Sequence, residues 1–548
     1  MCPWLRRPAV TAIILMAAIL LSPNMDTEPD APGAILTAQV QRPAAAPPAP
    51  ATRSAPAPPS AAPENATFGF ANVRQLAHER AVHEYRPVPD TLPAVLANLS
   101  YDQYRDIRFR PESALWRALS LFEVQFFHRG YLTRQRVNIF EVTAVGVSPI
   151  EYSPRLFGFG RMAKPPKLAA SLGFAGFRVH YPLQTPAYKD ELLVFLGASY
   201  FRLLARNQHY GASARGLAID TAAQSGEEFP TFTDFWLVRP HPSDRSLTLY
   251  ALLDSRSIAG AFQFDIRPGA ITQVEVHCEL YPRRAIAKLG IAPLTSMYFF
   301  GEDAAGRRFD DYRTEVHDSD GLMAQTGRGQ WLWRPIANPR ELRVNRFMDD
   351  GPKGFGLVQR EREFSRYGDM EAQYQARPSY WVQPLDGWGK GGAELVEIPS
   401  DEEIHDNIVA YWVSDQPVAA GKTISYSYLL SAFTEVPGWP PGGRVIATRS
   451  GNPAMGDNKG HFPSGARRFI VDFAGGDLDG LDAAQPVRAE VSAENGHLET
   501  VSVQRLPTHA WRVAMVVTPR PKKPIDLHCY LTLYGEALSE TWVYEWTP

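Results

Sequence analysis

The stretch ITQVEVHCELY, Ile271–Tyr281, decides the fold class because its side chains alternate in polarity. One set of alternate positions carries Val, Val, Cys and Leu, and the other set carries Glu, His and Glu. A β-strand points successive side chains to opposite faces, so this pattern is typical of a strand with one face in the core and one face in water. The stretch therefore predicts a half-buried β-strand.

The same period of two recurs along the chain. It is found in SLTLYALLDS, GAFQFDIRPG, RRFIVDF, AWRVAMVVTP and LHCYLTLYG, with Gly, Pro, Asp and Asn between them. A helical pattern is confined to two short segments near the start, FANVRQLAHERAV and PAVLANLSYDQYRDI. Short strands joined by turns favour antiparallel β-sandwiches over alternating βαβ units. We therefore expect an all-β protein.

A Pro/Gly-rich passage after ISYSYLLSAFTE divides the strand pattern in two. It contains VPGWPPGG and SGNPAMGDNKGHFPSG, and we interpret residues 436–459 as a linker between domains. Residues 460–548 hold about seven strand candidates, which is the size and pattern of an immunoglobulin-like sandwich. Residues 68–435 then form one large β-sandwich domain, which must be long and curved.

The start of the chain predicts export. Arg6 and Arg7 precede the apolar run Ala9 to Leu21, an order that is typical of a secretory signal. The run is short for a membrane span, which needs about 20 apolar residues, so a transmembrane anchor is the less favoured interpretation. We assign residues 1–38 to the export segment. Residues 39–67 are rich in Pro and Ala, and we expect them to be a disordered tether.

The composition excludes several classes of function. The 548-residue chain has 45% hydrophobic and 21% charged residues, and its formal net charge of −3 gives no reason to bind nucleic acid or an anionic membrane. Three cysteines occur. We expect Cys2 to leave with the export segment. We expect Cys278 and Cys529 to be buried and free, with a disulfide between them as the alternative.

Polar loops between the strands carry the residues that are capable of chemistry. The sequence contains no P-loop, nucleophile elbow, His-Glu-x-x-His or Cys-x-x-Cys motif, so we expect no cofactor. Acidic residues gather in TEVHDSDGL, Thr314–Leu322, and in VEIPSDEEIHDNIVAYW, Val396–Trp412. Glycoside hydrolysis uses two carboxyl groups, one protonated and one ionised, so these acidic segments are candidate catalytic loops. The alternative is that both segments are solvated turns. The spacing around His317 and His405 matches no standard ligand pattern, so we expect no metal site.

Aromatic side chains lie near these loops in the sequence. They occur in GQWLWRP, RPSYWVQP and LDGWGKG, the last of which contains Trp388. Flat rings stack on the apolar faces of sugars while charged groups bind the hydroxyls, so Trp388 is a candidate substrate-binding residue. Packing in the core is the alternative for each of these tryptophans.

Several longer segments together carry a resemblance to a known protein family. They are LGASYFRLLARNQHYGASARGLAIDTAAQSGEEFPTFTDFWLVRP, KLGIAPLTSMYFFG, TEVHDSDGL, GQWLWRPIANP, GFGLVQREREFSRYGDMEAQYQARPSYWVQP, GWGKGGAELVEIP and HDNIVAYW. Together these segments resemble the periplasmic glucan biosynthesis protein G/D family, from residue 68 to the C-terminus. The resemblance implies a large N-terminal β-sandwich like galactose-mutarotase domains, with a cleft, and an immunoglobulin-like C-terminal sandwich. It also implies a role in making osmoregulated periplasmic glucans, whose backbone is β-1,2-linked glucose.

The resemblance implies roles for single residues. The aspartate of HDNIVAYW matches the family's general acid, here Asp406. The aspartate that follows the histidine of TEVHDSDGL matches the general base, here Asp318, which acts through a chain of water and sugar hydroxyls. Glu403, Tyr374 and Arg377 match positions that line the glucan cleft. A general acid must be protonated near neutral pH, so we expect a desolvated Asp406 or a nearby acid such as Glu403.

Two functions agree with this interpretation. The first is an inverting β-1,2-glucan hydrolase or transglycosylase that acts on the glucan backbone in the periplasm. The second is a non-catalytic factor that binds the glucan and presents it to a membrane glucosyltransferase. The acid and base favour the first function, because a binding protein needs neither. His405 stands where the family has an asparagine. The expected partners are the glucan, the membrane glucosyltransferase and a second copy of the chain, with no nucleic acid and no membrane span.

Overall fold

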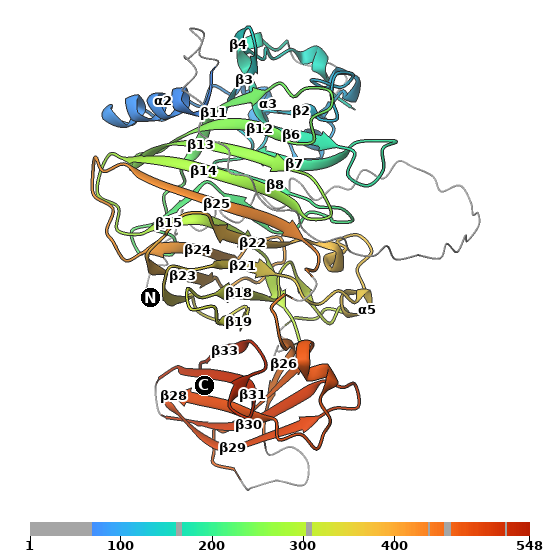
Figure 1. Ribbon diagram of the computed structural model, residues 1–548. Helices are drawn as coiled ribbons and strands as arrows, with labels where there is room; N and C mark the ends of the chain where they lie inside the picture. The colour runs from blue at the N-terminus through green and yellow to red at the C-terminus, as the bar shows by residue number, and fades with distance from the viewer. Residues whose placement is uncertain (1–67, 161–166, 303–308, 437–438, 454–461, 521–522) are drawn as a thin grey trace, which may run out of the picture.

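The computed structural model describes residues 68–160, 167–302, 309–436, 439–453, 462–520 and 523–548 (Figure 1). The predicted export segment and tether lie outside these residues. Strands dominate the described chain, as the alternating pattern predicts, and they form two extensive sheets and one smaller sheet. Within the described ranges no helix is both long enough and apolar enough to cross a membrane.

The large sheet contains the stretch that decided the fold class. Strand β14 (Thr272–Pro282) pairs in antiparallel register with β13 (Ile258–Arg267) and β25 (Ile424–Phe433), and its side chains alternate between buried and half-buried. The sheet has fifteen strands. From one edge to β25 the order is β28 (Arg488–Glu494), β31 (Ile525–Leu533), β33 (Thr541–Trp546), β19 (Trp331–Pro335), β18 (Gly321–Gln325), β21 (Gly354–Val358) and β22 (Ser379–Pro384), with β32 (Glu536–Ala537) beside β31. From β13 to the other edge the order is β12 (Leu247–Asp254), β11 (Thr231–Val238), β3 (Asn138–Thr143) and β4 (Gly146–Pro149).

A second, ten-stranded sheet packs against the large sheet. Its strands are β2 (Glu123–His128), β6 (Phe174–Tyr181), β7 (Asp190–Leu196), β8 (Tyr200–Leu203), β9 (Ser213–Arg215), β15 (Leu289–Ser296), β24 (Ile408–Ser414), β23 (Lys390–Glu397) and β20 (Arg343–Asp350), with β10 (Leu217–Ile219) beside β15. Phenylalanine rings fill the space between the sheets. The Phe195 ring of β7 lies 5.2 Å from Phe264 of β13 and 5.1 Å from Phe235 of β11.

The C-terminal part is a two-layer sandwich. A four-stranded sheet, made of β26 (Arg444–Gly451), β27 (Arg467–Ala474), β30 (Trp511–Pro519) and β29 (Gly496–Arg505), shares a core with β31 and β33 of the large sheet. Strand β26 lies inside the predicted 436–459 linker, so residues 444–451 are part of the C-terminal sandwich. Strand β33 also pairs in parallel with β19, which joins the two parts in one continuous sheet.

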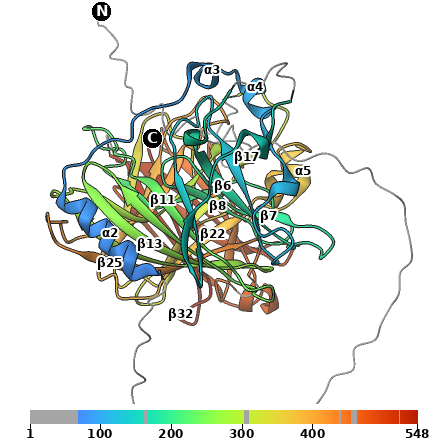
Figure 2. The same cartoon turned by 90° about the horizontal axis from the view of Figure 1, so that it is seen from above.

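Short elements complete the structure. Helix α2 (Phe70–Val82) coincides with the first predicted helical segment and covers β12 and β13 of the large sheet (Figure 2). The other short elements are the helices α3 (Ala94–Ala97), α4 (Tyr101–Arg105) and α5 (Phe364–Tyr367), the 3-10 turns η2 (Pro111–Ser113), η3 (Pro154–Leu156), η4 (Ala170–Leu172), η5 (Tyr374–Ala376) and η6 (Gly476–Gly480), and the strand pairs β1 (Arg108–Phe109) with β5 (Phe157–Gly158) and β16 (Tyr298–Phe300) with β17 (Val316–His317).

Two predictions about the composition can be compared with the structure. Cys278 and Cys529 are both free and buried, which confirms the prediction and removes the disulfide alternative.

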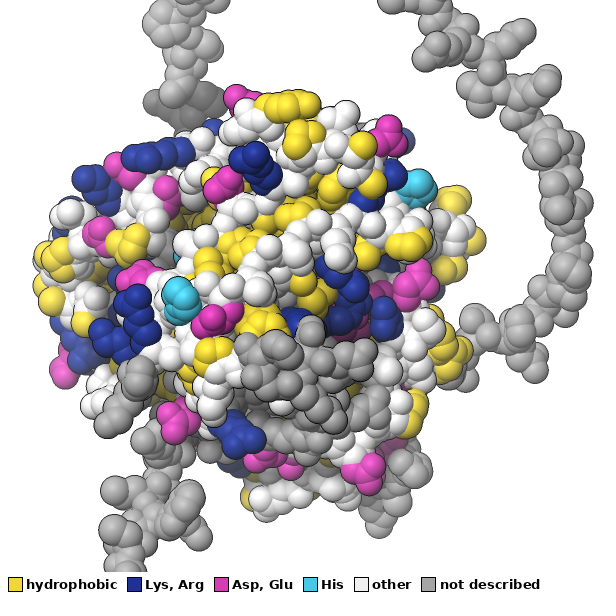
Figure 3. Space-filling model, turned by 90° about the horizontal axis from the view of Figure 1, so that it is seen from below, with side chains coloured by type: hydrophobic (Ala, Val, Ile, Leu, Met, Phe, Trp, Pro, Cys, Tyr) yellow, Lys and Arg dark blue, Asp and Glu magenta, His cyan; other side chains and the backbone are white. Residues whose placement is uncertain are grey.

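On the face drawn in Figure 3, Lys and Arg side chains lie interspersed with Asp and Glu rather than in a field of one sign. That distribution agrees with a net charge close to zero.

Candidate active site

A cavity of about 240 Å³ gathers charged side chains from distant parts of the sequence. Strand β8 contributes one residue, the segment after β17 another, η5 and the residue after it two more, and the loop between β23 and β24 a further two. These lining residues are Arg202, Asp318, Tyr374, Arg377, Glu403 and Asp406. The structure therefore brings together five of the six residues that the sequence singled out.

Asp406 lies at the end of the loop before β24, and its side chain is 4% exposed. Burial raises the pKa of Asp406 to about 6; the negative charge of Asp318 adds to the rise, while Arg202 and Arg377 oppose it. The Nη2 atom of Arg202 is 3.7 Å from the Oδ2 atom of Asp406. The desolvated environment agrees with the sequence-based expectation, but the neighbouring negative charge comes from Asp318 and not from Glu403.

Asp318 directly follows β17 and is also buried. Its backbone N–H donates to the carbonyl of Met297 at 2.8 Å, and its carboxylate accepts a hydrogen bond from Arg377 within an ion pair. The Arg377 guanidinium lies over the Tyr374 ring, 4.1 Å from the ring centre, and its Nε donates to the carbonyl of Ala372 at 3.2 Å. Asp318 is thus a fixed carboxylate with a defined cationic partner.

Glu403 is the most exposed of the three candidate acids in the cavity lining, with its side chain 37% exposed, whereas Asp318 and Asp406 are buried. It accepts a hydrogen bond from Arg313 at 2.6 Å and one from the Tyr374 hydroxyl at 3.5 Å. Arg313 also binds Asp369 at 2.9 Å and Asp311 at 2.7 Å. This ion-pair network fixes the Glu403 carboxylate at the cavity.

Residue types alone did not identify Arg202, Arg313 or Gly211. Arg202 and Gly211 lie in the run that carries the family resemblance, but no spacing rule connects either residue to an acid more than 100 positions away. At Gly211 a Cβ atom would stand 2.8 Å from the Cβ of Arg377, so a glycine is needed for Arg377 to reach Asp318.

Comparison with known proteins supplies the family. Residues 68–546 match the model of a family described as periplasmic glucan biosynthesis protein, MdoG. The chain belongs to this family. It is 47% identical over 489 residues to glucans biosynthesis protein G of Rhodopseudomonas palustris strain BisA53, which covers 88% of this chain and 94% of the relative. It is 45% identical over 485 residues to glucans biosynthesis protein G of Bradyrhizobium diazoefficiens (88% and 94%) and 42% identical over 494 residues to probable glucans biosynthesis protein D of Shewanella oneidensis (89% and 90%).

Trp388 of this periplasmic glucan biosynthesis family member does not lie at the cavity. Its ring is 5% exposed and packs in the main core, 6.2 Å from the ring centre of Trp412 and 5.5 Å from that of Tyr426. Trp331 and Trp381 likewise stack on each other in the second core. The core-packing alternative holds for these tryptophans, and Trp388 is removed from the candidate site.

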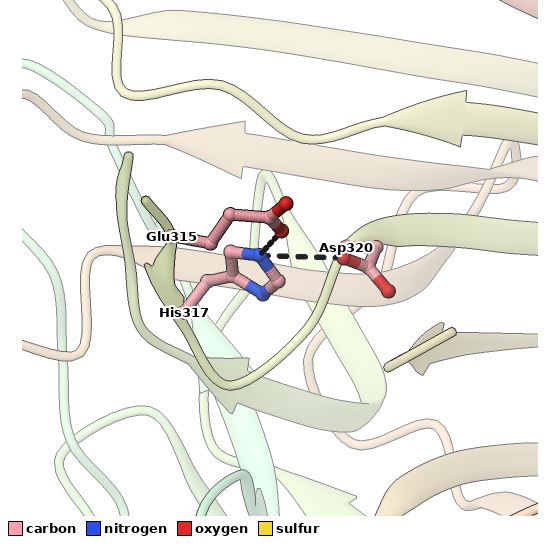
Figure 4. Close-up of side chains that lie close together, drawn as sticks. All are labelled: Glu315, His317 and Asp320. Carbon is pink, nitrogen blue, oxygen red and sulfur yellow. Dashed lines mark hydrogen bonds and ion pairs between the residues drawn. The ribbon is translucent and has the colours of Figure 1, made fainter. Parts of the chain in front are cut away.

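A buried histidine supports the segment that carries Asp318. The Nε2 atom of His317 lies 2.9 Å from Glu315 and 3.4 Å from Asp320 (Figure 4). Burial lowers the pKa of His317, but the carboxylates of Asp320 and Glu315 outweigh burial and raise it to about 9. The Nδ1 atom of His317 lies 2.9 Å from Oε1 of Gln359, whose Nε2 donates to the carbonyls of His317 and Tyr374.

These contacts decide how the cluster is protonated. Because Nε2 of Gln359 binds two carbonyls, its Oε1 must accept, so Nδ1 of His317 carries a hydrogen. Nε2 faces two carboxylates and carries the second hydrogen. Glu315, His317 and Asp320 offer three atoms within 4.8 Å of one another, as a metal centre also does. We describe the cluster as an imidazolium between two carboxylates, because its hydrogen bonds are complete in that form.

His405, which directly precedes Asp406, has a local role. Its Nδ1 atom lies 3.4 Å from the Ser400 hydroxyl and its Nε2 atom 3.7 Å from Glu402, whose side chain is 63% exposed. Burial lowers the pKa of His405. The histidine therefore connects two positions of the solvated loop just before Asp406.

Proposed function

We propose that this protein acts on the backbone of the periplasmic glucan as an inverting β-1,2-glucan hydrolase or transglycosylase. Family membership establishes involvement in periplasmic glucan biosynthesis. The observation that carries the enzymatic proposal is the pairing of two buried aspartates in one cavity, one with a pKa of about 6 and one in an ion pair. Glycosidases divide the acid and base roles between carboxyl groups in this way.

In this mechanism Asp406 is the proton donor. It gives its proton to the glycosidic oxygen as the bond from that oxygen to the anomeric carbon breaks. A water molecule attacks the opposite face of the anomeric carbon, and its proton passes to Asp318, directly or through water and sugar hydroxyls. Replacing the water by a hydroxyl of another glucan chain gives transglycosylation with the same proton transfers.

The surrounding side chains supply binding and electrostatics. Arg202 and Arg377 are buried cations beside the two aspartates, so they stabilise the carboxylate that Asp406 becomes after proton transfer. Glu403 and Tyr374 offer polar atoms to sugar hydroxyls at the open side of the cavity. The flat Tyr374 ring is occupied by the Arg377 guanidinium, so hydrogen bonds dominate over ring stacking in this cavity.

A second candidate function is glucan binding and presentation without cleavage. The direct ion pair between Asp318 and Arg377 favours it, because Arg377 already occupies an oxygen of the proposed base. The same lining residues then bind sugar hydroxyls and a partner enzyme performs the chemistry.

Incubation with linear β-1,2-glucan separates the two functions. We expect shortened or cyclised products, and proton NMR of the first reducing ends to show the α-anomer, which is the inverted configuration. Asp406→Asn is expected to abolish these products while isothermal titration still detects glucan binding. Binding without any product at high concentrations of the wild-type protein would establish the second function and refute the first.

A further inference from the structure

We propose that the C-terminal sandwich is part of the scaffold of this active site, with Glu540 as the positioning residue that links the two. The inference rests on the proposed function, because it concerns the orientation of Asp318. It assigns a role to a contact between the two parts of the chain that lies outside the cavity.

The link begins at an ion pair between the two parts. The Glu540 carboxylate, just before β33, is fully buried and binds the Arg360 guanidinium through both oxygens, at 2.5 and 2.9 Å. The backbone of Val445 in β26 donates to Glu540 at 2.8 Å and accepts from Arg360 at 2.9 Å. The guanidinium also lies 3.5 Å from the centre of the Trp333 ring. A bidentate, buried and stacked arginine of this kind is held in one orientation.

The backbone at Arg360 in turn holds the segment after Asp318. The N–H groups of Arg360 and Glu361 both donate to the Asp320 carboxylate, the second at 2.8 Å. The Asp320 N–H donates to the carbonyl of Val358 at 2.8 Å. Asp320, two positions after Asp318, is therefore bound through its backbone to the end of β21 and through its side chain to the residues that follow β21.

Gln359, the neighbour of Arg360, binds residues next to both partners of the Asp318–Arg377 ion pair. Its side chain contacts the ring and the carbonyl of His317, at 2.9 and 3.1 Å, and His317 directly precedes Asp318. The same amide donates to the carbonyl of Tyr374 at 3.3 Å, and the Tyr374 ring lies under Arg377. One short segment, anchored by Glu540, thus positions the carboxylate and its guanidinium together.

Loss of the Glu540 charge acts on turnover more than on binding. An uncompensated guanidinium moves toward solvent, and the Gln359 to Glu361 backbone moves with it. Small displacements of a reacting carboxylate reduce the rate strongly. Arg202 lies in β8 and Glu403 is bound by Arg313, so we expect both to keep their places at the cavity. We expect Glu540→Gln to lower kcat at least tenfold and to change KM less than threefold.

Glu545→Gln is the matched control. Glu545 lies in β33, five positions after Glu540, and also joins the two parts of the chain. It binds Arg343 at 3.0 Å and Asn345 at 2.7 Å, both in β20 at the edge of the second sheet. We expect this variant to keep the wild-type kcat. An equal loss of kcat in both variants would overturn the proposal, because the loss would then follow general weakening of the contact.

Amide hydrogen exchange makes the test independent of catalysis. In Glu540→Gln we expect faster exchange over residues 314–320 and 359–361 than in wild type, and in Glu545→Gln no change there. If the wild-type protein does not cleave glucan, the proposed function fails. The exchange rates still test whether Glu540 holds residues 314–320 and 359–361 in place. Unchanged exchange and unchanged kcat in Glu540→Gln would refute it. Arg360→Lys, which keeps the charge but loses the bidentate contact, replaces Glu540→Gln if that variant does not fold, with the same expected effects.

Discussion

Arg202→Met is the substitution that most directly tests the acid assignment. The guanidinium of Arg202 stabilises the ionised form of Asp406, so its removal raises the pKa of Asp406 above its present value of about 6. The acid then stays protonated to higher pH. The alkaline limb of the kcat profile is therefore expected to move to higher pH, even if the maximal rate falls.

The distance sets the size of this shift. At a separation of 3.7 Å between the charged atoms, two unit charges interact by about 4 kcal/mol at an effective dielectric constant of about 20. One pKa unit corresponds to about 1.4 kcal/mol, so about 3 units is the upper bound. Water in the open cavity screens part of the interaction, and we expect a rise of about 1 to 2 units.

The assay is the initial rate of linear β-1,2-glucan cleavage at saturating substrate between pH 4 and 9. Arg206→Met is the control, because Arg206 is exposed, lies on the same segment and binds the carbonyl of Leu183 at 3.1 Å instead of an acid. An alkaline limb that stays in place or moves to lower pH in Arg202→Met would refute the assignment of Asp406 as the proton donor.

The remaining predictions concern stability, packing and metals. Asp406→Asn is expected to unfold at a higher temperature than wild type at pH 8. The pKa of Asp406 is about 6 in the folded protein, above the ordinary 3.8, so the free energy of unfolding of the wild type falls by up to about 3 kcal/mol as pH rises through that range. Equal melting temperatures at pH 8 would contradict the desolvation argument. Gly211→Ala is expected to displace Arg377 and lower kcat roughly 10- to 100-fold with the fold retained. Gly387→Ala, where nothing lies within 4 Å of the added Cβ, serves as its control, and full activity of Gly211→Ala would contradict the close contact. Dialysis against a chelator is expected to leave activity and melting temperature unchanged, because the His317 cluster is complete without a metal; a loss that a divalent cation restores would reverse this interpretation.

Local patterns predicted the elements whose formation depends on neighbours in the sequence. The alternation in Ile271–Tyr281 predicted β14, and the helical period near the start predicted α2 with its bounds. The free, buried state of Cys278 and Cys529 was also predictable, because both lie on the apolar sides of alternating strands. In each case the side-chain period alone determines which face enters the core.

Motif resemblance singled out Asp318 and Asp406 as candidate catalytic residues, but the sequence could not say what surrounds them. Arg202 beside Asp406 and the Glu540 link to Arg360 join residues about 180 or more positions apart, a distance over which no periodicity extends. Trp388 is a second case that the sequence left open, because a tryptophan in a polar loop is typical of both a sugar platform and a core residue. Only the packing of its ring against Trp412 of β24 and Tyr426 of β25 decided for the core.

The amino-acid sequence by itself thus determined the all-β class, the strand faces and the family. The tertiary structure decided which charges meet in the cavity, why Asp406 is desolvated, and that the C-terminal sandwich shares a sheet and a buried ion pair with the large part of the chain. The physical reason is that a strand's period is a property of consecutive residues, whereas desolvation and charge pairing depend on which distant segments come to lie within a few ångströms of one another.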